Sequence, residues 1–188
     1  MADDSDEVIW QKVLSGDERQ YGTVWDRHRD RIFRHLIAGG HAATAAEDLT
    51  AVVFLELWRR RNAVRFVDGS LLPWLVVTAQ NVSRNAVRAR RRYEKFLAAL
   101  PTPPPVPDPA DRFADLDEER VIAVREAIAG ARPADAMLLA MTVLEGFTIR
   151  EAADALRLSE PAAKMRLTRL RARLRSAVST HLSPEGGS

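Results

Sequence analysis

The chain has 188 residues, of which 46% are hydrophobic, and a formal net charge of +2 at pH 7. This length and composition are typical of a globular protein with one medium domain or two small ones. It has no apolar run of about 18 residues, and its acidic start MADDSDE is unlike a signal peptide, so we expect a cytoplasmic protein without membrane insertion. The absence of cysteine excludes disulfides, thiolate zinc sites and cysteine nucleophiles, and the four histidines lack ligand spacing, so we predict no metal site and no cofactor.

The small net charge hides a strong segregation of charge along the chain. Acidic residues gather at 3–18 and 108–119, and basic residues gather at 84–95 and 164–175. Two separate basic segments indicate two contacts with one polyanion. Of the 28 basic residues only three are lysines, which favours bidentate contacts to phosphates and bases, although genome composition alone also explains such a bias.

The N-terminal part is predicted to be helical. Residues up to about 15 form an acidic lead-in to a helix with apolar residues at 8, 9, 13 and 14, and we assign no chemistry to it. From Tyr21 to Leu36, apolar residues recur at helical spacing among charged ones. Gly39 and Gly40 are predicted to stop this amphipathic helix.

Residues 46–61, AEDLTAVVFLELWRRR, form the next predicted helix. Thr44 and Glu47 have the spacing of a capping box at its start. Its apolar side chains cover more than half of the helix circumference, which one neighbouring helix cannot bury. The helix is therefore either the centre of a bundle or carries a second, apolar and acidic face around Asp48, Phe54 and Glu56 that is available to a partner.

A loop and a long helix follow. Residues 62–72 show no sustained period and contain Asp68-Gly69, which predicts a turn. Pro73 then begins a helix that extends to about Leu100. Its inward-facing residues are predicted to be Leu75, Val76, Ala79, Val82, Ala86 and Leu97.

Four polar residues stand out on that long helix. Asn81 and Asn85 are stacked one turn apart, and Arg84 and Arg88 form a second such pair beside them. Amides and guanidinium groups side by side suit a surface that reads unpaired bases and holds their backbone. The alternative is a solvated helix face with ordinary polar residues.

A proline-rich, acidic segment divides the chain. Residues 101–109 hold six of the ten prolines, and five acidic residues follow between 111 and 119. We predict a stiff, extended linker between two all-helical domains. Beyond it, helices are predicted at about 121–128 and 136–144, the second opened by Pro133 and closed by Gly146.

Residues 148–175 have the pattern of a helix-turn-helix. Thr148 and Glu151 form a capping box, and apolar residues at 149, 152, 153 and 156 follow at helical spacing. Ser159 is the predicted N-cap of the second helix, and Pro161 lies in its first turn, where the missing N–H costs little. The second helix is predicted to end near Val178.

This second helix has one apolar stripe and a basic opposite side. Ala163, Leu167, Leu170 and Leu174 fall on the stripe and are predicted to face the protein. Every charged residue from 164 to 175 is positive, which suits flanks that meet phosphates and a crest that meets base edges. A solvated basic face is the plainer alternative, and a membrane-surface helix is disfavoured because the crest lacks Trp and Phe. The crest holds Pro161, Ala162, Met165, Thr168, Arg169 and Ala172.

Three motifs, in this order, resemble those of the bacterial RNA polymerase sigma factors, specifically the extracytoplasmic-function (ECF) group of the sigma-70 family. AEDLTAVVFLELWRR resembles region 2.2, LLPWLVVTAQNVSRNAVRARRR resembles regions 2.3 and 2.4, and EGFTIREAADALRLSEPAAKMRLTRLRARLR resembles region 4. The resemblance covers nearly the whole chain. It implies an all-α protein with a region 2 domain at 1–100, a linker at 101–118, a region 4 domain at 119–182 and a disordered tail at 183–188.

The resemblance also implies a non-enzymatic factor that binds core RNA polymerase and directs promoter-specific transcription initiation. Its partners would be the clamp helices of the largest polymerase subunit, the flap of the second subunit and promoter DNA, with an anti-sigma factor as a further candidate. The residues implied for polymerase binding are Asp48, Leu49, Phe54, Leu57 and Trp58. Those implied for minus 35 DNA are Lys164, Met165, Arg166, Thr168, Arg169 and Arg171. Those implied for minus 10 recognition and melting are Val67, Asp68, Gly69, Trp74, Asn81, Arg84, Asn85 and Arg88, with the loop at 64–72 holding a flipped base.

Two positions depart from the pattern of that family. Ala51 and Val52 stand where Gln-Glu is common, and Pro161 to Ala163 stand where Gly-Thr-Val is usual, so promoter sequence rules do not transfer. The main alternative is a stand-alone helix-turn-helix regulator, which would bind duplex DNA tightly without polymerase. A histidine-dependent hydrolase is disfavoured because the chain has no constellation around a nucleophile.

Overall fold

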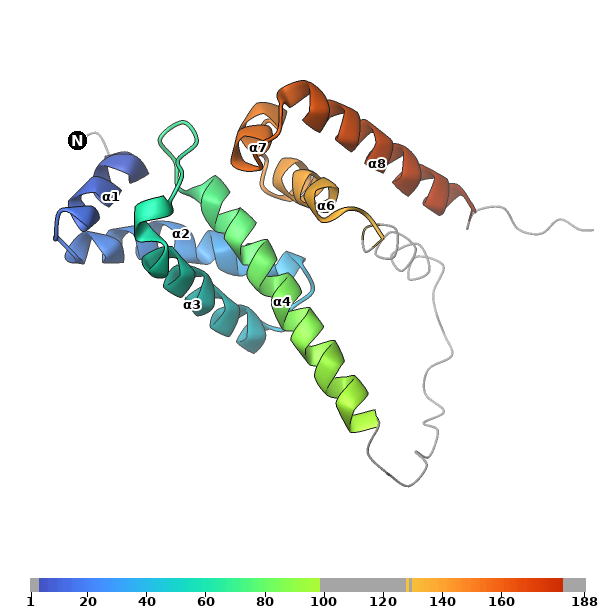
Figure 1. Ribbon diagram of the computed structural model, residues 1–188, viewed down its shortest axis with the longest axis horizontal. Coiled ribbons are helices and arrows are strands. Elements are labelled where there is room, and N and C mark those ends of the chain that lie inside the picture. Colours follow the sequence, from blue (N-terminus) through green and yellow to red (C-terminus); the bar gives the residue numbers. More distant parts are fainter. Residues whose placement is uncertain (1–3, 99–127, 129, 181–188) are drawn as a thin grey trace, which may run out of the picture.

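The computed structural model describes residues 4–98, 128 and 130–180, and the regular secondary structure of this part of the chain is helical (Figure 1). The predicted all-α fold is therefore confirmed. Within these residues no helix combines the length and the apolar content that crossing a bilayer requires. The elements are α1 (Asp6–Leu14), α2 (Arg19–Ala38), α3 (Ala43–Arg59), a 3-10 turn η1 (Arg61–Ala63), α4 (Leu72–Ala98), α6 (Pro133–Leu139), a π-helical turn η2 (Ala140–Leu144), α7 (Ile149–Ala155) and α8 (Glu160–Thr180).

The N-terminal helices form a bundle in which α2, α3 and α4 pack on one another and α1 packs on α2. Aromatic side chains fill the junction between α2 and α3, where the ring centroids of Trp25 and Phe54 lie 4.6 Å apart. The hydroxyl group of Tyr21 donates a 2.6 Å hydrogen bond to the carbonyl of Phe54. The fully packed side chains of the bundle include Trp10, Val24, Ile32, Leu36, Val53, Phe54, Leu57, Leu75, Val76 and Ala79.

The packing of α3 answers whether the side that carries Phe54 lies at the centre of the bundle or is available to a partner. Phe54 and Leu57 are buried, so their side of α3 is the centre of the bundle. The predicted capping box at Thr44 and Glu47 is wrong, because α3 already begins at Ala43 and its N-cap makes no side-chain hydrogen bond. The helix starts one residue before Thr44, and this position leaves the threonine inside the first turn.

A buried carboxylate ties α1 to α2 and to the loop before α4. Asp6 lies 2.7 Å from Nη1 of Arg27 and 2.8 Å from Nε2 of His28, and it accepts a 2.8 Å hydrogen bond from the backbone N–H of Leu71. Burial raises the pKa of a carboxyl group, but the hydrogen bonds from His28, the Leu71 amide and Arg27 outweigh it and hold the pKa of Asp6 well below its usual range. The N-terminal acidic segment, to which we assigned no chemistry, therefore fixes the loop.

The loop at 66–71 folds back as a tight turn. Asp68 and Gly69 both have positive φ, 50° and 75°, and backbone hydrogen bonds join Val67 and Ser70 in both directions at 3.1 and 3.0 Å. Positive φ at both central residues is the geometry of a two-residue hairpin turn, which Asp-Gly favours. The predicted turn is confirmed.

The C-terminal helices enclose a C-terminal core that is continuous with the core of the N-terminal bundle. The capping box of Thr148 and Glu151 is confirmed, and the hydroxyl group of Ser159 accepts a 3.4 Å hydrogen bond from the N–H of Ala162 at the start of α8. The stretch at 136–144, predicted as one helix, ends in the π-helical turn η2. The predicted linker and most of the predicted helix at 121–128 lie outside the described residues. The buried residues of this core are Met137, Leu138, Met141, Ala152, Ala153, Ala163, Leu167 and Leu170.

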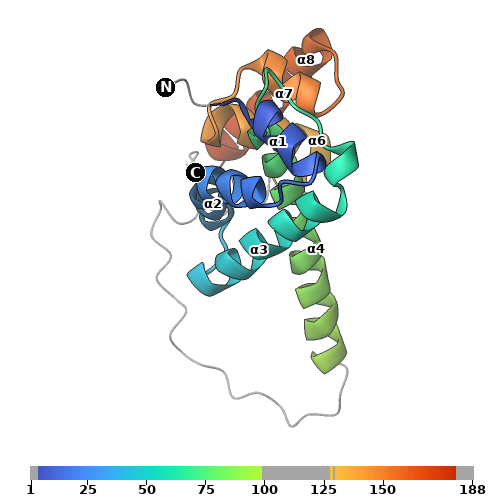
Figure 2. The same cartoon turned by 90° about the vertical axis from the view of Figure 1, so that its left-hand side faces the viewer.

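The two groups of helices pack against each other. Helix α7 contacts α4, and Figures 1 and 2 both show α6 and α7 beside the upper half of α4, near the 66–71 loop. The far half of α4 extends beyond the other described helices. The helices on either side of the predicted linker thus share an interface.

We predict that Asp6→Asn destabilises the N-terminal bundle by about 3 kcal/mol at pH 7, because it removes one partner of a buried charge network. The depressed pKa of Asp6 has a second consequence. The ionised Asp6 carboxylate contributes to the free energy of unfolding at pH values above the unfolded-state pKa of about 3.9. This contribution is lost as the pH falls toward the lower pKa of Asp6 in the folded protein. Urea unfolding followed by tryptophan fluorescence should therefore show a steeper loss of stability in acid for the native chain than for the variant.

The matched control is Glu7→Gln, which changes an exposed carboxylate in the same helical turn. Equal unfolding midpoints for the native chain and Asp6→Asn from pH 7 down to pH 3 would contradict this assignment.

Candidate nucleic-acid interface

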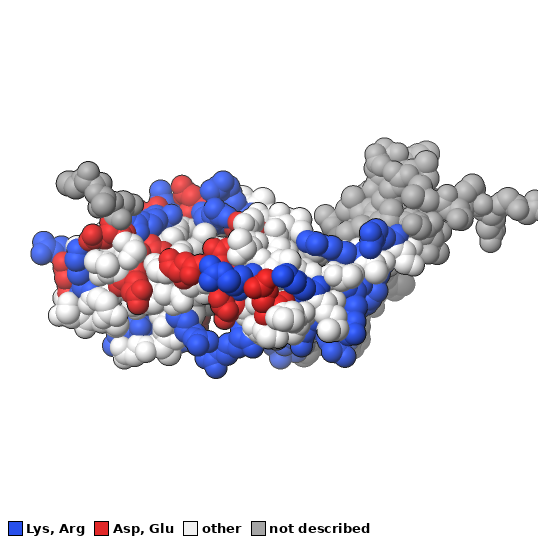
Figure 3. All heavy atoms as spheres, turned by 90° about the horizontal axis from the view of Figure 1, so that it is seen from above, with Lys and Arg blue, Asp and Glu red and all other residues white. Residues whose placement is uncertain are grey.

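Helix α8 presents its predicted crest to solvent. Leu167 and Leu170 anchor the opposite side of the helix in the core, which turns Met165 and Arg169 outward. Figure 3 shows lysine and arginine side chains without acidic neighbours toward the far end of α8, whereas acidic side chains gather over the other half of this face. Of the residues predicted to contact minus 35 DNA, those exposed are Lys164, Met165, Thr168, Arg169 and Arg171.

The cations of α8 differ in their freedom to meet a ligand. Nη1 of Arg166 lies 3.4 Å from the carboxylate of Asp135 on α6, so this predicted contact is half-buried and paired within the bundle. Nζ of Lys164 lies 2.7 Å from Glu160. Among the described residues, Arg169 and Arg171 have no hydrogen-bond or ion-pair partner, which leaves both guanidinium groups available.

The polar face of α4 lies in a groove shared with α3. Asn81, Asn85 and Arg88 are exposed and Arg84 is half-buried. Nη2 of Arg84 donates a hydrogen bond to the amide oxygen of Asn81, so these two side chains pair with each other across one turn. The groove has a volume of about 520 Å³, and its walls include Leu49, Val52, Asn81, Val82 and Asn85. It brings a residue predicted for polymerase binding beside residues predicted for melting.

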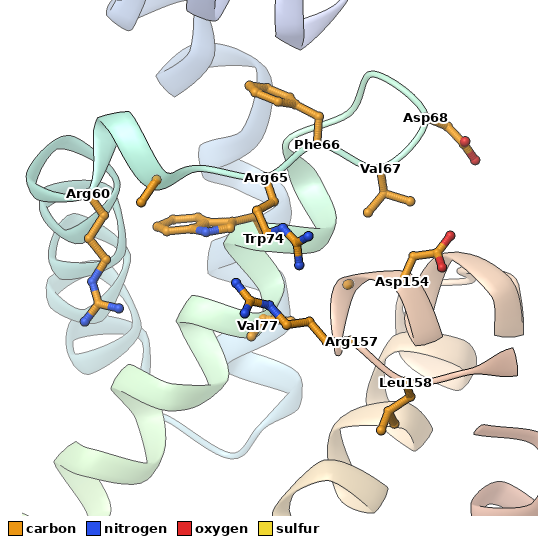
Figure 4. Close-up of a pocket in the computed structure, with 12 residues that line it drawn as sticks. Arg60, Arg65, Phe66, Val67, Asp68, Trp74, Val77, Asp154, Arg157 and Leu158 are labelled. Atoms are coloured by element: carbon orange, nitrogen blue, oxygen red, sulfur yellow. The ribbon is translucent and has the colours of Figure 1, made fainter. Parts of the chain in front are cut away.

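A second, larger cavity of about 850 Å³ lies where the 66–71 loop meets the helix-turn-helix (Figure 4). Val67, Asp68 and Trp74 line it as the resemblance implies, whereas Gly69 does not. Three arginines also line it, which the sequence pattern did not single out. The lining residues from the N-terminal bundle include Arg60, Arg65, Phe66, Val67 and Trp74, and those from the helix-turn-helix are Asp154, Ala155, Arg157 and Leu158.

Arg157 enters this cavity because of its backbone conformation. Its φ of 57° reverses the chain after α7, and the next amide, that of Leu158, then donates a 2.9 Å hydrogen bond to the carbonyl of Ala153. In Figure 4 the guanidinium group of Arg157 points toward Val77 and lies near Arg65 and Trp74. The turn of the helix-turn-helix thus contributes a cation to a cavity formed mainly by the other bundle.

The residues predicted for polymerase binding are divided between surface and core. Asp48 is exposed, and Leu49 and Trp58 are half-buried. Phe54 and Leu57 are 2% and 0% exposed, so they hold α3 in the bundle and have no surface to offer a partner directly. This corrects the predicted face around Phe54.

Two apolar residues of α3 are exposed, and the sequence pattern singled out only the first of them, as a departure from the family. Val52 and Leu55 are 40% and 46% exposed. Together with Asp48 they occupy positions i, i+4 and i+7, which lie on one side of an α-helix. We name the side formed by Asp48, Val52 and Leu55 the outer face of α3. Helical spacing was the signal for it, but the apolar residues surround so much of α3 that only the packing distinguishes the outer side from the inner one.

A buried ion cluster joins the two bundles. The carboxylate of Glu145 lies 2.9 Å from Nε of Arg31 and 2.7 Å from Nδ1 of His35. Burial raises the pKa of the Glu145 carboxyl group, but hydrogen bonds and charge attraction from His35 and Arg31 outweigh it and lower the pKa below its ordinary value. In the described part of the chain no three histidine, aspartate or glutamate side chains form a group that could hold a metal ion.

Residues 24–93 match the Sigma-70 region 2 family. The chain is 29% identical over 172 residues to the probable RNA polymerase sigma factor RfaY of Xanthomonas campestris pv. campestris, a match covering 88% of this chain and 42% of the relative. It is 25% identical over 169 residues to the RNA polymerase sigma factor CarQ of Myxococcus xanthus, covering 89% of this chain and 94% of the relative.

A third relative, the ECF RNA polymerase sigma factor SigK of Mycobacterium sp. (strain KMS), is 26% identical over 117 residues, or 61% of each chain. The matches thus span less than two thirds of the Xanthomonas and Mycobacterium relatives.

Two solved structures have a similar fold. CnrH, in complex with the cytosolic domain of CnrY, superposes with a TM-score of 0.61 at 22% identity, and the match covers 94% of this chain and 99% of that one. The sigma factor RpoE of Bartonella quintana, in complex with the anti-sigma factor NepR, superposes with a TM-score of 0.53 at 18% identity, covering 86% and 98%. Residues 24–93 therefore match a Sigma-70 region 2 domain, and the chain as a whole is similar to proteins named RNA polymerase sigma factors, among them an ECF sigma factor.

Proposed function

We propose that this protein binds core RNA polymerase and directs promoter-specific transcription initiation, with α8 reading the minus 35 duplex and α4 with the 66–71 loop holding unpaired minus 10 bases. The observation that carries the proposal is the presence of two differently built basic surfaces on two bundles of one chain. One is a convex helix crest, and the other is a groove and a cavity with amides, arginines and aromatic rings.

The crest of α8 suits a duplex. An α-helix fits the major groove, and an arginine there pairs with the O6 and N7 atoms of guanine. Arg169 is exposed and has no ion-pair partner among the described residues, so binding to DNA does not break an internal ion pair. Lys164 and Arg171 flank the crest and are positioned to contact phosphates, which hold the register of the helix in the groove.

The groove and cavity around α4 suit a single strand. The indole ring of Trp74 and the side chain of Phe66 offer apolar surfaces for an unstacked base, and Arg60 and Arg65 offer charge to its phosphates. Stacking is worth about 1–3 kcal/mol for each base, against a few kcal/mol for unpairing it. Capture of the unpaired bases by this surface therefore offsets a large part of the cost of unpairing them.

The outer face of α3 suits a protein partner. This face combines an exposed carboxylate with two exposed apolar side chains. Apolar side chains that lie together at the surface often mark a site where another protein binds. We assign this face to the clamp helices of the largest polymerase subunit and the C-terminal bundle to the flap of the second subunit. An anti-sigma factor is a further proposed partner of the chain.

The decisive experiment is reconstitution with core RNA polymerase. We expect the purified chain to form a complex with the core enzyme and to direct transcription from a cognate promoter that neither component transcribes alone. Tight binding of the isolated chain to that promoter at physiological salt, unchanged by core enzyme, would favour a stand-alone regulator instead.

For α8, Arg169→Ala should weaken promoter use by about 1–3 kcal/mol if the side chain pairs with a guanine. The loss should be largest on the cognate minus 35 element and small on a promoter with that base pair changed. Competition transcription on the two templates measures the difference. Arg132→Ala, which removes an exposed arginine beside α6, is the matched control. An equal loss on both templates would make Arg169 a phosphate contact.

For α4, Asn81→Ala should leave the affinity for core enzyme unchanged and slow promoter opening, because the amide contacts bases only after they unpair. Permanganate footprinting of promoter thymines, followed over time, measures the opening rate. Asn62→Ala removes an exposed asparagine outside α4 and serves as control. Thymine reactivity that develops at the native rate in the Asn81 variant would remove this residue from the melting surface.

For the outer face of α3, Asp48→Arg should weaken binding to core enzyme by more than roughly tenfold, since a favourable charge becomes a repulsive one at the contact. A fluorescence titration with core polymerase measures the Kd. Glu47→Arg makes the same charge change at an exposed neighbour that points about 100° away around the helix. Equal losses in the two variants would show a general charge effect and refute the assigned face.

A further inference from the structure

The buried polar contact between the two bundles is centred on one carboxylate. Glu145, in the loop after η2, reaches across the interface, and its side chain is only 5% exposed. One oxygen accepts a 2.9 Å hydrogen bond from Nε of Arg31, and the other lies 2.7 Å from Nδ1 of His35. The guanidinium group of Arg31 also donates to the backbone carbonyl of Glu145. Nε2 of the same histidine lies 3.2 Å from the side-chain oxygen of Gln80, which extends the cluster from α2 to α4.

The π-helical turn η2 places Glu145 at this contact. The backbone N–H of Glu145 donates a 3.2 Å hydrogen bond to the carbonyl of Ala140, five residues earlier. A π-turn takes one more residue than an α-turn, so it rotates the residues that follow relative to a regular helix. Such turns occur frequently at functional positions. The glutamate is thereby directed at α2 and not toward solvent.

Apolar side chains of both bundles belong to one hydrophobic cluster, and apolar packing is non-directional. Another ion pair across the interface is more exposed than the Glu145 cluster. Arg150 of α7 forms a 2.7 Å ion pair with Asp68 of the loop, but both side chains are more than half exposed, and water screens such a pair. The Glu145 cluster is buried, so removing one partner leaves an uncompensated charge in the interface. Glu145 is therefore the centre of the buried polar contact between the bundles.

This closed arrangement conflicts with binding at two promoter elements. The turn of the helix-turn-helix lines the same cavity as Val67 and Trp74. Helix α8 begins just after this turn, at Glu160, and Arg169 lies only about 14 Å farther along the helix at a rise of 1.5 Å per residue. The minus 35 and minus 10 elements are about 25 base pairs apart, or about 85 Å of duplex at 3.4 Å per base pair. Both surfaces cannot reach their elements while the bundles are in contact.

We propose that Glu145 is an intramolecular latch, which holds the free chain closed through Arg31 and His35 and must release before both DNA surfaces are used. The latch is a property of the free chain. That it inhibits binding to polymerase and promoter DNA rests on the proposed function. Closure also places Asp154, Arg157 and Leu158 at the cavity proposed to hold an unpaired base (Figure 4). The chain between Ala98 and Ile128 reaches roughly 100 Å when fully extended, so its connectivity permits the separation.

The latch is tested by a distance measurement across the interface. The chain has no cysteine, so Thr23→Cys on α2 and Ala172→Cys on α8 introduce two exposed positions for spin labels. Double electron–electron resonance should give one narrow distribution of short distances between the two labels in the otherwise native chain. Glu145→Gln should shift the distribution to longer and broader distances, with the closed population reduced roughly tenfold or more, because the charged hydrogen bonds are lost.

Controls separate release of the latch from general damage. Glu160→Gln removes a carboxylate of the same bundle that pairs with Lys164 inside α8, and it should leave the distances unchanged. Arg31→Gln, on the opposite side of the contact, should open the chain as Glu145→Gln does, and the double variant should add little to either. Circular dichroism should show native helicity in all of them. A compact distribution in folded Glu145→Gln, or an open one in the native chain, would overturn the latch.

The inhibitory role has its own measurement. The Kd for core polymerase should fall several-fold in Glu145→Gln, because less of the chain is held in the closed state. An opened variant whose affinity for polymerase equals that of the native chain would overturn the inhibition and leave the latch standing. Failure of native chain and variant alike to bind polymerase would instead refute the proposed function.

Discussion

Two buried histidines on α2 hold the segments that surround this helix. His28 and His35 are two turns apart on the inner side of α2, between the apolar residues Val24, Ile32 and Leu36. Each histidine meets a carboxylate from a distant segment, Asp6 in one case and Glu145 in the other. Buried charges are tolerated only when they are paired and hydrogen-bonded, so each pair specifies one position for the segment that supplies the carboxylate.

These two pairs position the surfaces proposed to bind DNA. The carboxylate of Asp6 also accepts from the Leu71 amide, so α1 and α2 together set the loop that carries Val67 and Asp68 beside Trp74. The second pair positions the helix-turn-helix over that loop. Helix α2 carries no residue that we assign to DNA or polymerase, yet both the base-capture cavity and the packing of the C-terminal bundle depend on it.

The two proposed DNA surfaces are built for different forms of DNA. The crest of α8 is convex and rests on a leucine stripe, which suits insertion into a groove of intact duplex. The α4 groove and the adjacent cavity are concave and combine amides, guanidinium groups and aromatic rings, which suits separated bases. A single chain that holds both surfaces can couple duplex recognition to strand separation, provided that an outside partner holds the bundles apart. Core polymerase is the partner that we propose for this role.

Local features of the fold followed from the sequence. The capping box at Thr148, the Asp68-Gly69 turn and the buried stripe through Leu167 and Leu170 depend on residues within a few positions of one another, so spacing alone identified them. The same reasoning failed at Thr44, because α3 begins one residue earlier, at Ala43, without any side-chain cap. The resemblance of the α3 and α4 motifs to sigma factor region 2 agrees with the family match over residues 24–93.

Tertiary structure decided which side of each helix is available and what joins distant segments. The apolar pattern of α3 did not separate the buried Phe54 and Leu57 from the exposed Val52 and Leu55, because hydrophobicity is the same on both sides and only the packing of α2 and α4 distinguishes them. The pairing of Glu145 with His35 joins residues 110 positions apart. No local period encodes a contact at that separation, because it depends on how the two groups of helices pack together.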